Sequence, residues 1–476
     1  MGLCSSDIVN GAGGTLVTGR GEAAFSGVSI DSRGISGGEI FFAVRGDRFD
    51  GHDFVSTLPE RGAGGAVVSK GWEGLSTLSG LPHDFCLITV DDTRKALGDA
   101  AKYWRERHPI PLAAVSGSCG KSTTKEMIAA IMGVKREVLK TEGNRNNLLG
   151  LPLTILDLNE SHQVGVVELG ISEEGEMTRL AEIAKPDVAL LTNIGISHIS
   201  SLGSFQGVAR AKGELFHCLK PDGTEVINFD DLWIVEMTAK SKRRKITYSV
   251  EEKADVCLKG YEAKGSGYDG MIARFSLFDE EIAVEIRGIG SYNLSNAAAA
   301  IATASALGAE PDEIVEGLSH YIPMKNRMEP LHLNGVTLLD DTYNANPDSM
   351  ETALRTLSEF RGRRIAVLGD MLELGDIARD VHRRIGGLAS RLGVERLVLY
   401  GEFKGEMYEG AVDEGMDGDA ACTVKSKDDA VEMLRKIVRD GDVVLVKGSR
   451  GMGMEDVVEK FRERLSTKQE QRITSR

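Results

Sequence analysis

The residues best suited to chemistry lie between 112 and 125, where a short apolar run is followed by a glycine-bracketed turn, a lysine and a cluster of hydroxyls. Backbone N–H groups at Gly117 and Gly120 can surround a phosphate, and the positive end of the following helix favours an anion. Lys121 adds a point charge, and the Ser122 hydroxyl can ligate the magnesium ion that accompanies a triphosphate. This segment therefore predicts a site for a nucleotide triphosphate.

The spacing of this loop departs from the usual phosphate-binding pattern. That pattern has a glycine five positions before Gly120, but Val115 stands there and the first glycine is Gly117. A loop this short should approach the phosphates differently from that of an ordinary kinase or GTPase. Thr123 offers a second hydroxyl for the magnesium ion. The alternative is a chance glycine turn before a helix, which the order of strand, loop, lysine and hydroxyl disfavours.

Two other expected strand ends carry groups that suit the same site. Parallel sheets bind ligands outside the carboxyl ends of their strands. Glu168 ends the apolar run 164–167, and His198 follows the strand expected over 187–193. A carboxylate and an imidazole near a triphosphate can complete a magnesium shell. Each also has a plainer explanation, as a solvated carboxylate or as a histidine with a local hydrogen bond.

Lys212 lies within a helix expected over 205–220. It falls on the apolar stripe of that helix, together with Val208, Leu215 and Phe216. Burial lowers the pKa of an ammonium, which makes a reactive neutral amine more accessible. The stem could instead extend along the surface with its charge in water. The residues alone leave both possibilities open.

A polar cluster begins the last third of the chain. Arg327 suits a phosphate because its guanidinium is a fork of donors. The segment 340–347 follows a strand expected over 336–339 and ends in a proline, as a binding loop would. A simple surface turn is the alternative for this loop.

Composition excludes several classes of function. The chain has 476 residues and a formal net charge of −15, which argues against a nucleic-acid partner. Its 6 cysteines are scattered without a C-x-x-C pair, so they indicate neither a disulfide framework nor a zinc site and favour a reducing cytoplasm. No apolar run approaches the length of a membrane span, and we expect no membrane insertion.

The order of expected elements predicts an α/β protein of three domains. Residues 1–108 carry short strands between glycine-rich turns, typical of a small mixed α/β domain. Residues 109–325 alternate apolar strands with helices, which predicts a parallel, P-loop-like sheet with an antiparallel extension near 256–288. Residues 326–476 repeat the rhythm and predict a smaller, Rossmann-like domain.

Segments spread over nearly the whole chain resemble the Mur ligase family. The most specific are Tyr-Asn-Ala-Asn-Pro at 343–347 and Gly-Asp-Met-Leu-Glu-Leu-Gly at 369–375. These two separate the dipeptide-adding members from the relative that adds the third amino acid. The segments that carry the resemblance are 29–33, 41–53, 117–125, 143–147, 168, 193–198, 209–214, 292–296, 340–350, 369–375 and 447–450.

The resemblance implies an ATP-dependent amide ligase of cytoplasmic peptidoglycan precursor synthesis. Such an enzyme joins D-alanyl-D-alanine to UDP-N-acetylmuramoyl-tripeptide through an acyl phosphate and releases ADP and phosphate. The resemblance also implies two magnesium ions and a carbamate formed on Lys212, which agrees with the buried position proposed for that lysine. We expect the chain to act as a monomer.

The resemblance also implies roles for individual residues. Catalysis would depend on Lys121, His198, Lys212 and Arg327. The metal ions would be held by Ser122, Glu168, His198 and the modified Lys212. ATP would bind Gly117, Ser118, Cys119, Gly120, Lys121, Ser122 and Thr123, with Asn293 and Asn296 at the adenine and Arg327 and Asp341 at the phosphates and ribose. The UDP-peptide and dipeptide would meet Asp31, Ser32, Arg33, Asp50, Gly51, His52, Asn146, Asn147, Tyr343, Asn344 and Asn346.

The sequence departs from the family pattern in two places. Members usually continue after the histidine with Leu-Glu, whereas Ile199 and Ser200 follow here, so the local negative charge is missing. Many members have glycine before the arginine, where this chain has Asn326. Neither change removes an expected ligand.

Other functions are compatible with parts of this pattern. The relative that adds the third amino acid is disfavoured by the 343–347 string, and folylpolyglutamate synthetase by the N-terminal segment containing Asp50, Gly51 and His52. A nucleotide-binding scaffold without catalysis is disfavoured because Lys121, Glu168, His198 and Lys212 are all present.

Overall fold

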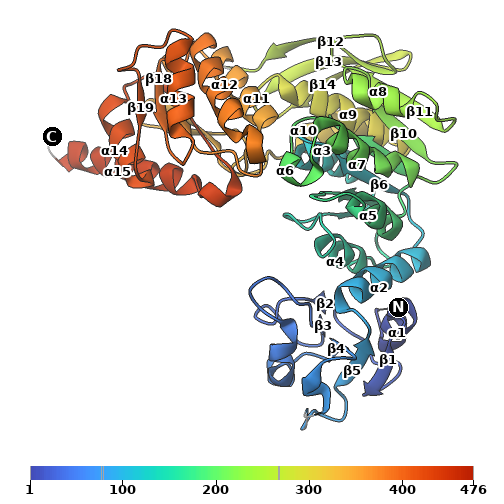
Figure 1. Cartoon of the computed structure of the whole chain (residues 1–476). Coiled ribbons are helices and arrows are strands. Elements are labelled where there is room, and N and C mark those ends of the chain that lie inside the picture. Colours follow the sequence, from blue (N-terminus) through green and yellow to red (C-terminus); the bar gives the residue numbers. More distant parts are fainter. Residues whose placement is uncertain (1, 77, 79, 266–268, 475–476) are drawn as a thin grey trace.

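Three α/β bodies follow one another along the chain, each built on its own sheet (Figure 1). The computed structural model describes residues 2–76, 78, 80–265 and 269–474. The N-terminal body lies at the bottom of the view, the central body lies above it, and the C-terminal body extends to the left. This architecture confirms the expected α/β class with three sheets.

The N-terminal sheet has the order β1-β5-β4-β3-β2 and is parallel except for β1. Its three inner strands are buried almost throughout, which is why they read as continuous apolar runs. The strands are β1 (Thr15–Thr18), β2 (Val28–Ser29), β3 (Ile40–Phe42), β4 (Gly65–Ser69) and β5 (Cys86–Val90). The helices are α1 (Ser5–Ala12), η1 (Gly51–Thr57), η2 (Pro59–Arg61), η3 (Glu73–Ser76) and α2 (Thr93–Arg107).

Helix α2 joins the N-terminal body to the central one. It packs against α1 on one side and against α4 (Gly150–Leu156) and α5 (Glu176–Ala184) on the other. Trp104 Nε1 donates to the Leu158 carbonyl at 2.9 Å, and Arg105 Nε donates to the Ala184 carbonyl at 3.0 Å. A single hydrophobic core runs from the N-terminal strands through Leu97 to α5. The first two bodies are therefore firmly connected.

The central sheet has the order β14-β13-β12-β11-β10-β9-β6-β8-β7. It is parallel from β7 to β12, and the expected antiparallel extension is formed by β12, β13 and β14. The strands are β6 (Leu112–Ser116), β7 (Val138–Lys140), β8 (Val164–Glu168), β9 (Val188–Leu191), β10 (Thr224–Asn228), β11 (Arg244–Ser249), β12 (Val256–Ala263), β13 (Met271–Leu277) and β14 (Glu280–Ile286).

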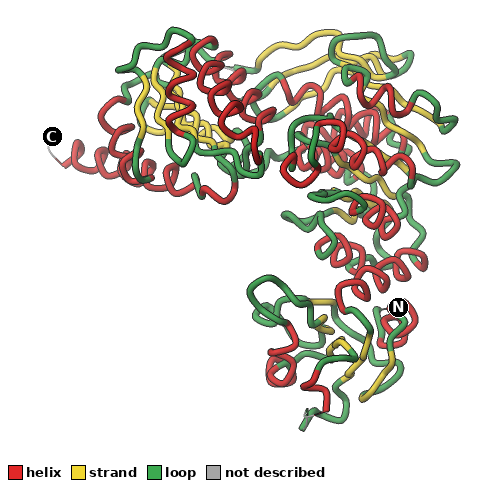
Figure 2. The backbone as a smooth tube through the Cα atoms, viewed as in Figure 1, coloured by secondary structure: helices red, strands yellow, loops and turns green. Residues whose placement is uncertain are grey.

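Helices cover both faces of the central sheet (Figure 2). One core contains residues of α3, α9 and α10, and the other contains residues of α2, α4, α5 and α7. The remaining helices of this body are α3 (Lys121–Met132), α6 (Ile199–Leu202), α7 (Phe205–His217), α8 (Leu232–Thr238), α9 (Tyr292–Ala306) and α10 (Pro311–His320). Within the described ranges, no helix combines the length and the hydropathy needed to cross a membrane.

Strand β6 lies between β8 and β9, and this order brings their carboxyl ends together. Val115 of β6 pairs with Glu168 of β8 and with Leu190 of β9. All three strands run in the same direction, so the loops that follow them meet at one edge of the sheet. The expected site lies at this edge.

The C-terminal sheet has the order β15-β16-β20-β17-β18-β19 and is parallel except for β15. Its strands are β15 (Glu329–Leu333), β16 (Val336–Asp341), β17 (Arg364–Leu368), β18 (Arg396–Leu399), β19 (Ala421–Thr423) and β20 (Val443–Lys447). Its helices are α11 (Pro347–Glu359), η4 (Gly375–Ile377), α12 (Ala378–Arg391), α13 (Lys404–Asp413), α14 (Lys427–Ile437), η5 (Arg450–Met452) and α15 (Glu455–Thr474).

One expected boundary in this body is wrong. The strand expected over 336–339 continues to Asp341, so Asp340 and Asp341 belong to β16 and not to the loop after it. The cause is distant in sequence: β16 pairs with β20 as far as Asp341 and Lys447.

Candidate functional site

The loop after β6 has two positions where only glycine fits. Gly117 has φ 136°, and a Cβ there would lie 2.0 Å from Thr192 Oγ1. Gly120 has φ 81°, and a Cβ there would lie 2.4 Å from Asn296 Oδ1. Positive φ combined with this crowding excludes any side chain. The glycines therefore serve the close approach of this loop to its neighbours.

The loop after β9 holds the loop after β6 in place. Asn193 Oδ1 accepts from Cys119 N at 2.9 Å, and Gly195 N donates to Ser118 Oγ at 2.8 Å. Thr192 Oγ1 donates to the Cys119 carbonyl at 2.5 Å. The two loops form one hydrogen-bonded unit ahead of α3. Because Asn193 already engages the N–H groups of Ser118 and Cys119, the N–H groups suited to an anion are those of the first turn of α3, which have no partner within the helix.

Two lysines converge on this unit. Lys121 Nζ donates to the Gly117 carbonyl at 2.9 Å, and Lys212 Nζ, reaching from α7, donates to the same oxygen at 3.2 Å. Lys212 is 2% exposed, so its stem does not extend to the surface. Burial, reinforced by the charge of Lys121, lowers the pKa of Lys212 to about 7. A neutral amine is accessible there near neutral pH.

Glu168 has the features expected of a cation ligand. It ends β8, is 3% exposed, and its backbone N–H donates to Thr141 Oγ1 at 2.9 Å. Asn146 Nδ2 donates to Oε1 at 2.7 Å. The other oxygen, Oε2, is buried and has no partner among the described residues. A buried carboxylate oxygen without a donor is costly, and a bound cation would satisfy it.

A metal ion at Glu168 would need further ligands from a bound substrate. In the described part of the chain, no three His, Cys, Asp or Glu side chains gather to form a metal site. Mg²⁺ is commonly held by one or two carboxylates together with phosphate oxygens. Glu168 and the Ser122 hydroxyl at the start of α3 fit that type of site.

His198 follows β9 and directly precedes α6, with φ 51°. Its Nδ1 lies 2.6 Å from Oε2 of Glu373, which belongs to the C-terminal body. Burial lowers the pKa of the imidazole, Glu373 opposes that effect, and the charges of Lys212 and Lys121 add to it.

Arg327 connects the C-terminal body to the phosphate loop. Its Nη2 donates to Ser122 Oγ at 3.0 Å, and its guanidinium lies 4.0 Å from the centre of the Tyr343 ring. Its Nε is buried without a partner among the described residues. The preceding Asn326 has φ 59°, a conformation that favours glycine and that asparagine tolerates. Asparagine therefore suits this position, where the family resemblance led us to expect glycine.

The other residues expected in the C-terminal loop hold the site together. Asp341 pairs with Lys447 at 2.6 Å, and Lys447 Nζ also donates to the Asn344 carbonyl at 2.9 Å. Asn346 caps α11 and accepts from Cys119 Sγ at 3.3 Å. In this loop, Asn346 therefore contacts the phosphate loop, and Tyr343 contacts Arg327.

The residues expected at the adenine lie behind the phosphate loop. Asn296 Nδ2 donates to Asn293 Oδ1 at 3.2 Å, and Asn293 Nδ2 donates to the Ile289 carbonyl at 2.9 Å. Thr124 Oγ1 donates to Asn296 Oδ1 at 3.4 Å. These contacts connect the start of α9 to α3. Their contact with an adenine stays a prediction.

The N-terminal residues of the expected UDP site lie in a different body from the phosphate loop. Arg33 pairs with Asp31 at 2.7 Å and, through its hydrogen bonds, holds the pKa of Asp31 at about 2. The carbonyl of Ser32 accepts from Arg61 Nη1 at 2.9 Å. The structure keeps this set apart from Lys121 and Lys212.

His52 is held on both sides of its ring. Its Nδ1 lies 2.6 Å from Asp50 Oδ1, and its Nε2 accepts from Ser69 N at 3.0 Å. A Cβ on Gly51 would lie 2.8 Å from Val44 N, so that position also needs glycine. Asn147 Oδ1 accepts from the N–H of Gly150, the first residue of α4, at 2.9 Å. Hydrogen bonds within the protein thus account for the positions of the His52 and Asn147 side chains.

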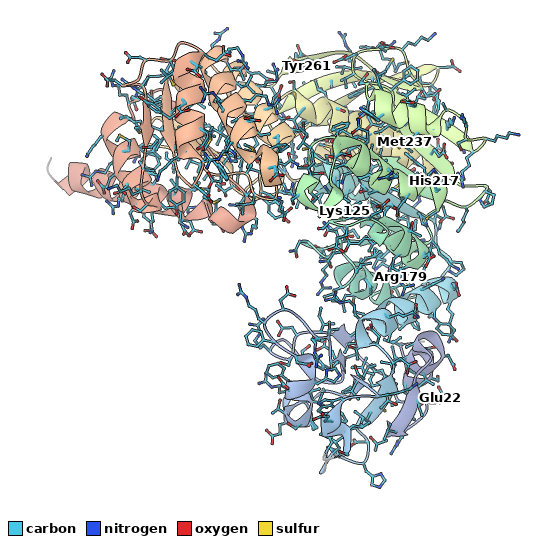
Figure 3. All side chains as sticks on the ribbon, in the orientation of Figure 1. Glu22, Lys125, Arg179, His217, Met237 and Tyr261 are labelled. Carbon is cyan, nitrogen blue, oxygen red and sulfur yellow. The ribbon has the colours of Figure 1, made fainter. Side chains whose placement is uncertain are left out.

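Sequence reasoning missed several residues at this site. Asp348 Oδ2 accepts from Ile196 N at 2.6 Å, and burial raises the pKa of Asp348. Lys125, labelled in Figure 3, is fully buried in α3, where its Nζ donates to the Thr141 carbonyl at 2.5 Å and pairs with Glu126. All three residues lie in segments that carry the family resemblance, Asp348 in 340–350, Glu373 in 369–375 and Lys125 in 117–125, but no individual role was expected for any of them.

Comparisons with known proteins agree with this geometry. Residues 115–304 match the Mur ligase middle domain, residues 326–450 match the "Mur ligase, glutamate ligase domain", and residues 24–74 match the "Mur ligase family, catalytic domain". The UDP-N-acetylmuramoyl-tripeptide–D-alanyl-D-alanine ligase of Bacillus subtilis is 34% identical over 449 residues, which is 94% of this chain and 95% of the relative. The chain belongs to the Mur ligase family.

Solved structures of Mur ligases share the whole architecture. A crystal structure of MurF from Acinetobacter baumannii superposes with a TM-score of 0.87 at 29% identity, covering 97% of this chain and 99% of that one. MurF ligase from Thermotoga maritima in complex with ADP gives a TM-score of 0.81 at 28% identity, covering 93% and 98%. The three-body arrangement of this Mur ligase is therefore that of its family.

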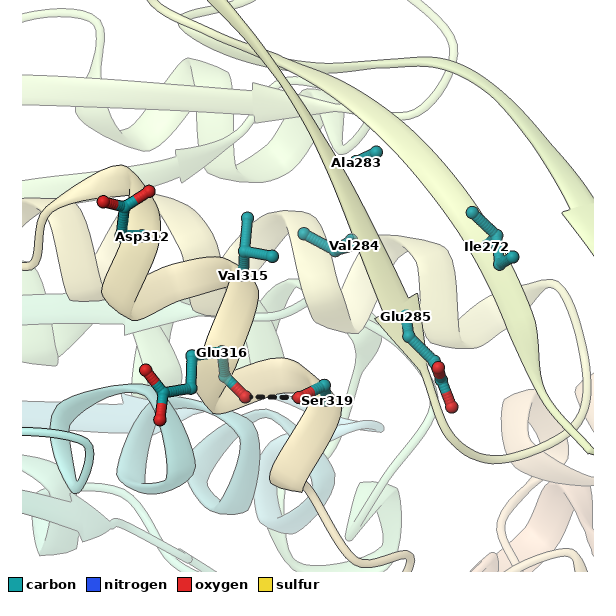
Figure 4. A pocket seen from close by; sticks show the side chains of 8 residues that line it. All are labelled: Ile272, Ala283, Val284, Glu285, Asp312, Val315, Glu316 and Ser319. Carbon is teal, nitrogen blue, oxygen red and sulfur yellow. Dashed lines mark hydrogen bonds between the residues drawn. The ribbon is translucent and has the colours of Figure 1, made fainter.

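A separate hollow of about 380 Å³ lies between α10 and the β13–β14 hairpin of this Mur ligase (Figure 4). It is lined by Ile272 and Glu285 on the strands and by Asp312, Glu316 and Ser319 on the helix. None of the expected site residues lines it.

Proposed function

We propose that this Mur ligase joins D-alanyl-D-alanine to UDP-N-acetylmuramoyl-tripeptide, with ATP converted to ADP and phosphate. The observation that carries the proposal is the convergence of Lys121, Lys212 and Arg327 on one glycine loop at the edge of the central sheet. The relatives that match over nearly the full chain are named for this reaction. Peptidoglycan precursor synthesis, and through it cell shape and division, is the process served.

The first step is attack by the terminal carboxylate of the tripeptide on the γ-phosphorus of ATP. Two anions must meet, and the charges of Lys121 and Arg327 offset their repulsion and the charge that develops in the transition state. The bond from γ-phosphorus to the bridging oxygen breaks, and ADP leaves with that electron pair. The products are an acyl phosphate and ADP.

The second step is attack by the amine of D-alanyl-D-alanine on the acyl carbonyl. The amide C–N bond forms, the C–O bond to phosphate breaks, and the amine loses a proton. Water would destroy the acyl phosphate, so the site has to be closed during this step. The contacts of the C-terminal body with the phosphate loop, through Arg327 and Asn346, support such closure.

Magnesium ions and a modified lysine complete the proposal. Bound Mg²⁺ would supply charge neutralisation at the phosphates. We assign Ser122 and Glu168 to one ion, and His198 and Lys212 to the other. A carbamate on Lys212 would form when its neutral amine adds to CO₂ and a proton is released; burial of Lys212 and its pKa of about 7 support that reaction.

The remaining assignments follow from the same proposal. We assign the UDP end of the substrate to residues 1–108, ATP to 109–325, and the closing contacts to 326–476. All 6 cysteines are free, which fits a reducing cytoplasm. We expect a monomer, because the loops of one chain suffice to bring the proposed catalytic residues together.

The test measures the rate of phosphate release from ATP in the presence of the UDP-tripeptide. The rate with D-alanyl-D-alanine is compared with the rate without an amine and with the rates for other amines. We expect fast release only with the dipeptide, together with a product whose mass is increased by that dipeptide. Equal rates with single amino acids or with a glutamate acceptor would contradict the assignment.

A further inference from the structure

His198 is held in an unusual conformation by the C-terminal body. It has a positive φ of 51°, although it is not glycine, and its ring is 32% exposed. The side chain at hydrogen-bonding distance from the ring is Glu373, with 2.6 Å between Nδ1 and Oε2. The helix that follows, α6, consists of Ile199, Ser200, Ser201 and Leu202 and has no carboxylate of its own.

Glu373 lies in a loop that is fitted to α6. Its φ is 64°, so both members of the pair are non-glycine residues in the left-handed region. The Glu373 carbonyl accepts from Ser200 N at 3.3 Å, and a Cβ on Gly375 would lie 3.5 Å from Ser200 Cβ. Strained residues persist where their surroundings fix them, and they gather at functional sites. The pair is therefore held from both bodies.

The contact determines which ring nitrogen carries the hydrogen. At 2.6 Å, an unprotonated Nδ1 would place its lone pair against a carboxylate oxygen, so Nδ1–H must donate to Glu373. In the neutral ring, the lone pair is then on Nε2. Histidines that serve metal or phosphate sites commonly have their other nitrogen fixed by a carboxylate in this way.

We propose that Glu373 is a positioning residue that orients His198 and fixes its Nδ1–H form from the C-terminal body. The site of the central body is then complete only when the loop 369–375 is docked on α6. This inference rests on the proposed function for its catalytic consequence, but the state of the His198 ring can be tested without it. Glu373 supplies from another body the negative charge that Ile199 and Ser200 do not.

The first test compares Glu373→Ala with Glu373→Gln. The amide oxygen of glutamine can accept the same hydrogen bond, whereas alanine cannot. We expect kcat to fall about 10- to 100-fold in Glu373→Ala and to stay close to the wild-type value in Glu373→Gln. The KM for D-alanyl-D-alanine should change little in either variant. Asp376→Asn, an exposed carboxylate near the same loop, is the matched control and should behave as wild type.

The second test reads the ring directly in the ligand-free protein. Nitrogen-15 spectra of histidine-labelled protein should show the Nδ1–H form for His198 in wild type and Glu373→Gln, and a shift towards the Nε2–H form in Glu373→Ala. His198→Gln identifies the signal. An unchanged tautomer in Glu373→Ala would overturn the inference. It would also be overturned if Glu373→Gln were as impaired as Glu373→Ala and had a raised KM for the dipeptide. If wild type fails to ligate, the proposed function fails while the spectra still decide this inference.

Discussion

Lys212 shows how the surroundings of one side chain decide its chemistry. Its ammonium has lost contact with water and lies near the charge of Lys121, so its pKa is about 7 instead of the ordinary 10.5. Holding a charged lysine there costs free energy, a cost that proteins commonly carry at functional sites. Its burial was predictable from its place on the apolar stripe of α7. The second lysine beside it was not, because Lys121 is 91 positions away.

Replacing Lys212 with methionine should stabilise the protein and abolish ligation. The folded-state pKa is below the unfolded one, so the cost is fully present below about pH 7 and disappears as pH rises towards 10.5. In CO₂-free buffer below pH 7, we expect the free energy of unfolding to rise by up to about 5 kcal/mol. Urea unfolding across this pH range measures the gain, and a constant difference at every pH would contradict it.

The same position tests the carbamate. Lys212→Ala should lose ligation, and short carboxylic acids should restore part of it by occupying the space of the missing group. Lys220→Ala, an exposed lysine three residues beyond α7, is the control and should keep full activity. Normal turnover of Lys212→Ala would remove Lys212 from the site.

Arg327→Lys should impair catalysis although the charge is kept. Lysine has neither the planar fork nor the stacking surface that guanidinium presents to Tyr343 and Ser122. We expect kcat/KM to fall by about 100-fold, as when one donor to a developing anion is lost. Arg355→Lys on the exposed side of α11 is the matched control. Equal activities of the two variants in a phosphate-release assay would contradict this role.

At the scale of elements, the strand–loop–helix around Gly117 could be predicted because its determinants are local. The apolar run, the glycines and the hydroxyl cluster lie within fifteen residues of one another. The end of β16 could not be predicted from the sequence, because Asp341 is kept in the strand by its partner Lys447 on β20. The hydrogen bond from Asn146 to Glu168 was not expected, because it is set by how two loops meet; the contact of Asn146 with the substrate stays a prediction. Residues close in the chain determine that an element forms, whereas its partners across the sheet determine where it ends.

Gly117→Ala should disable the phosphate loop. The added Cβ would lie 2.0 Å from Thr192 Oγ1, so the loops after β6 and β9 would have to separate. We expect loss of measurable ATP binding in calorimetry, with the fold retained. Gly175→Ala is the control: its φ of 85° is also positive, but nothing lies within 4 Å of its Cβ. ATP binding by Gly117→Ala as tight as by Gly175→Ala would refute this account of the loop.

At the scale of the whole molecule, both junctions between bodies contain apolar contacts. The N-terminal body shares a hydrophobic core with the central one through α2. The core of the C-terminal body includes Ile289 of the central body, and Ile196, Ile199 and Tyr292 pack against that core. Polar pairs add to the second junction, among them Arg327 with Ser122 and Asp348 with Ile196. The order of strands and helices predicted the three sheets. The family resemblance predicted that Arg327 reaches the phosphates, but no local pattern marks the pair of Asp348 with Ile196, which are 152 positions apart.

Asp348→Ala should loosen the docking of the C-terminal body. The Ile196 N–H would lose its acceptor, and leaving a buried donor unpaired costs about 1–3 kcal/mol. We expect a larger radius of gyration in small-angle scattering and a raised KM for ATP. Asp380→Ala on the exposed side of α12 should change neither. An unchanged radius and KM in Asp348→Ala would show that this contact does not hold the bodies together.

The measurement that tests the central claim most directly is the fate of the substrate's carboxylate oxygen. UDP-N-acetylmuramoyl-tripeptide labelled with oxygen-18 in its terminal carboxylate is turned over with ATP and D-alanyl-D-alanine, and the released phosphate is analysed by mass. Because the carboxylate attacks the γ-phosphorus and the amine then displaces phosphate, the account predicts one labelled oxygen in each phosphate. Phosphate without label, or phosphate released equally well in the absence of the UDP-tripeptide, would contradict it.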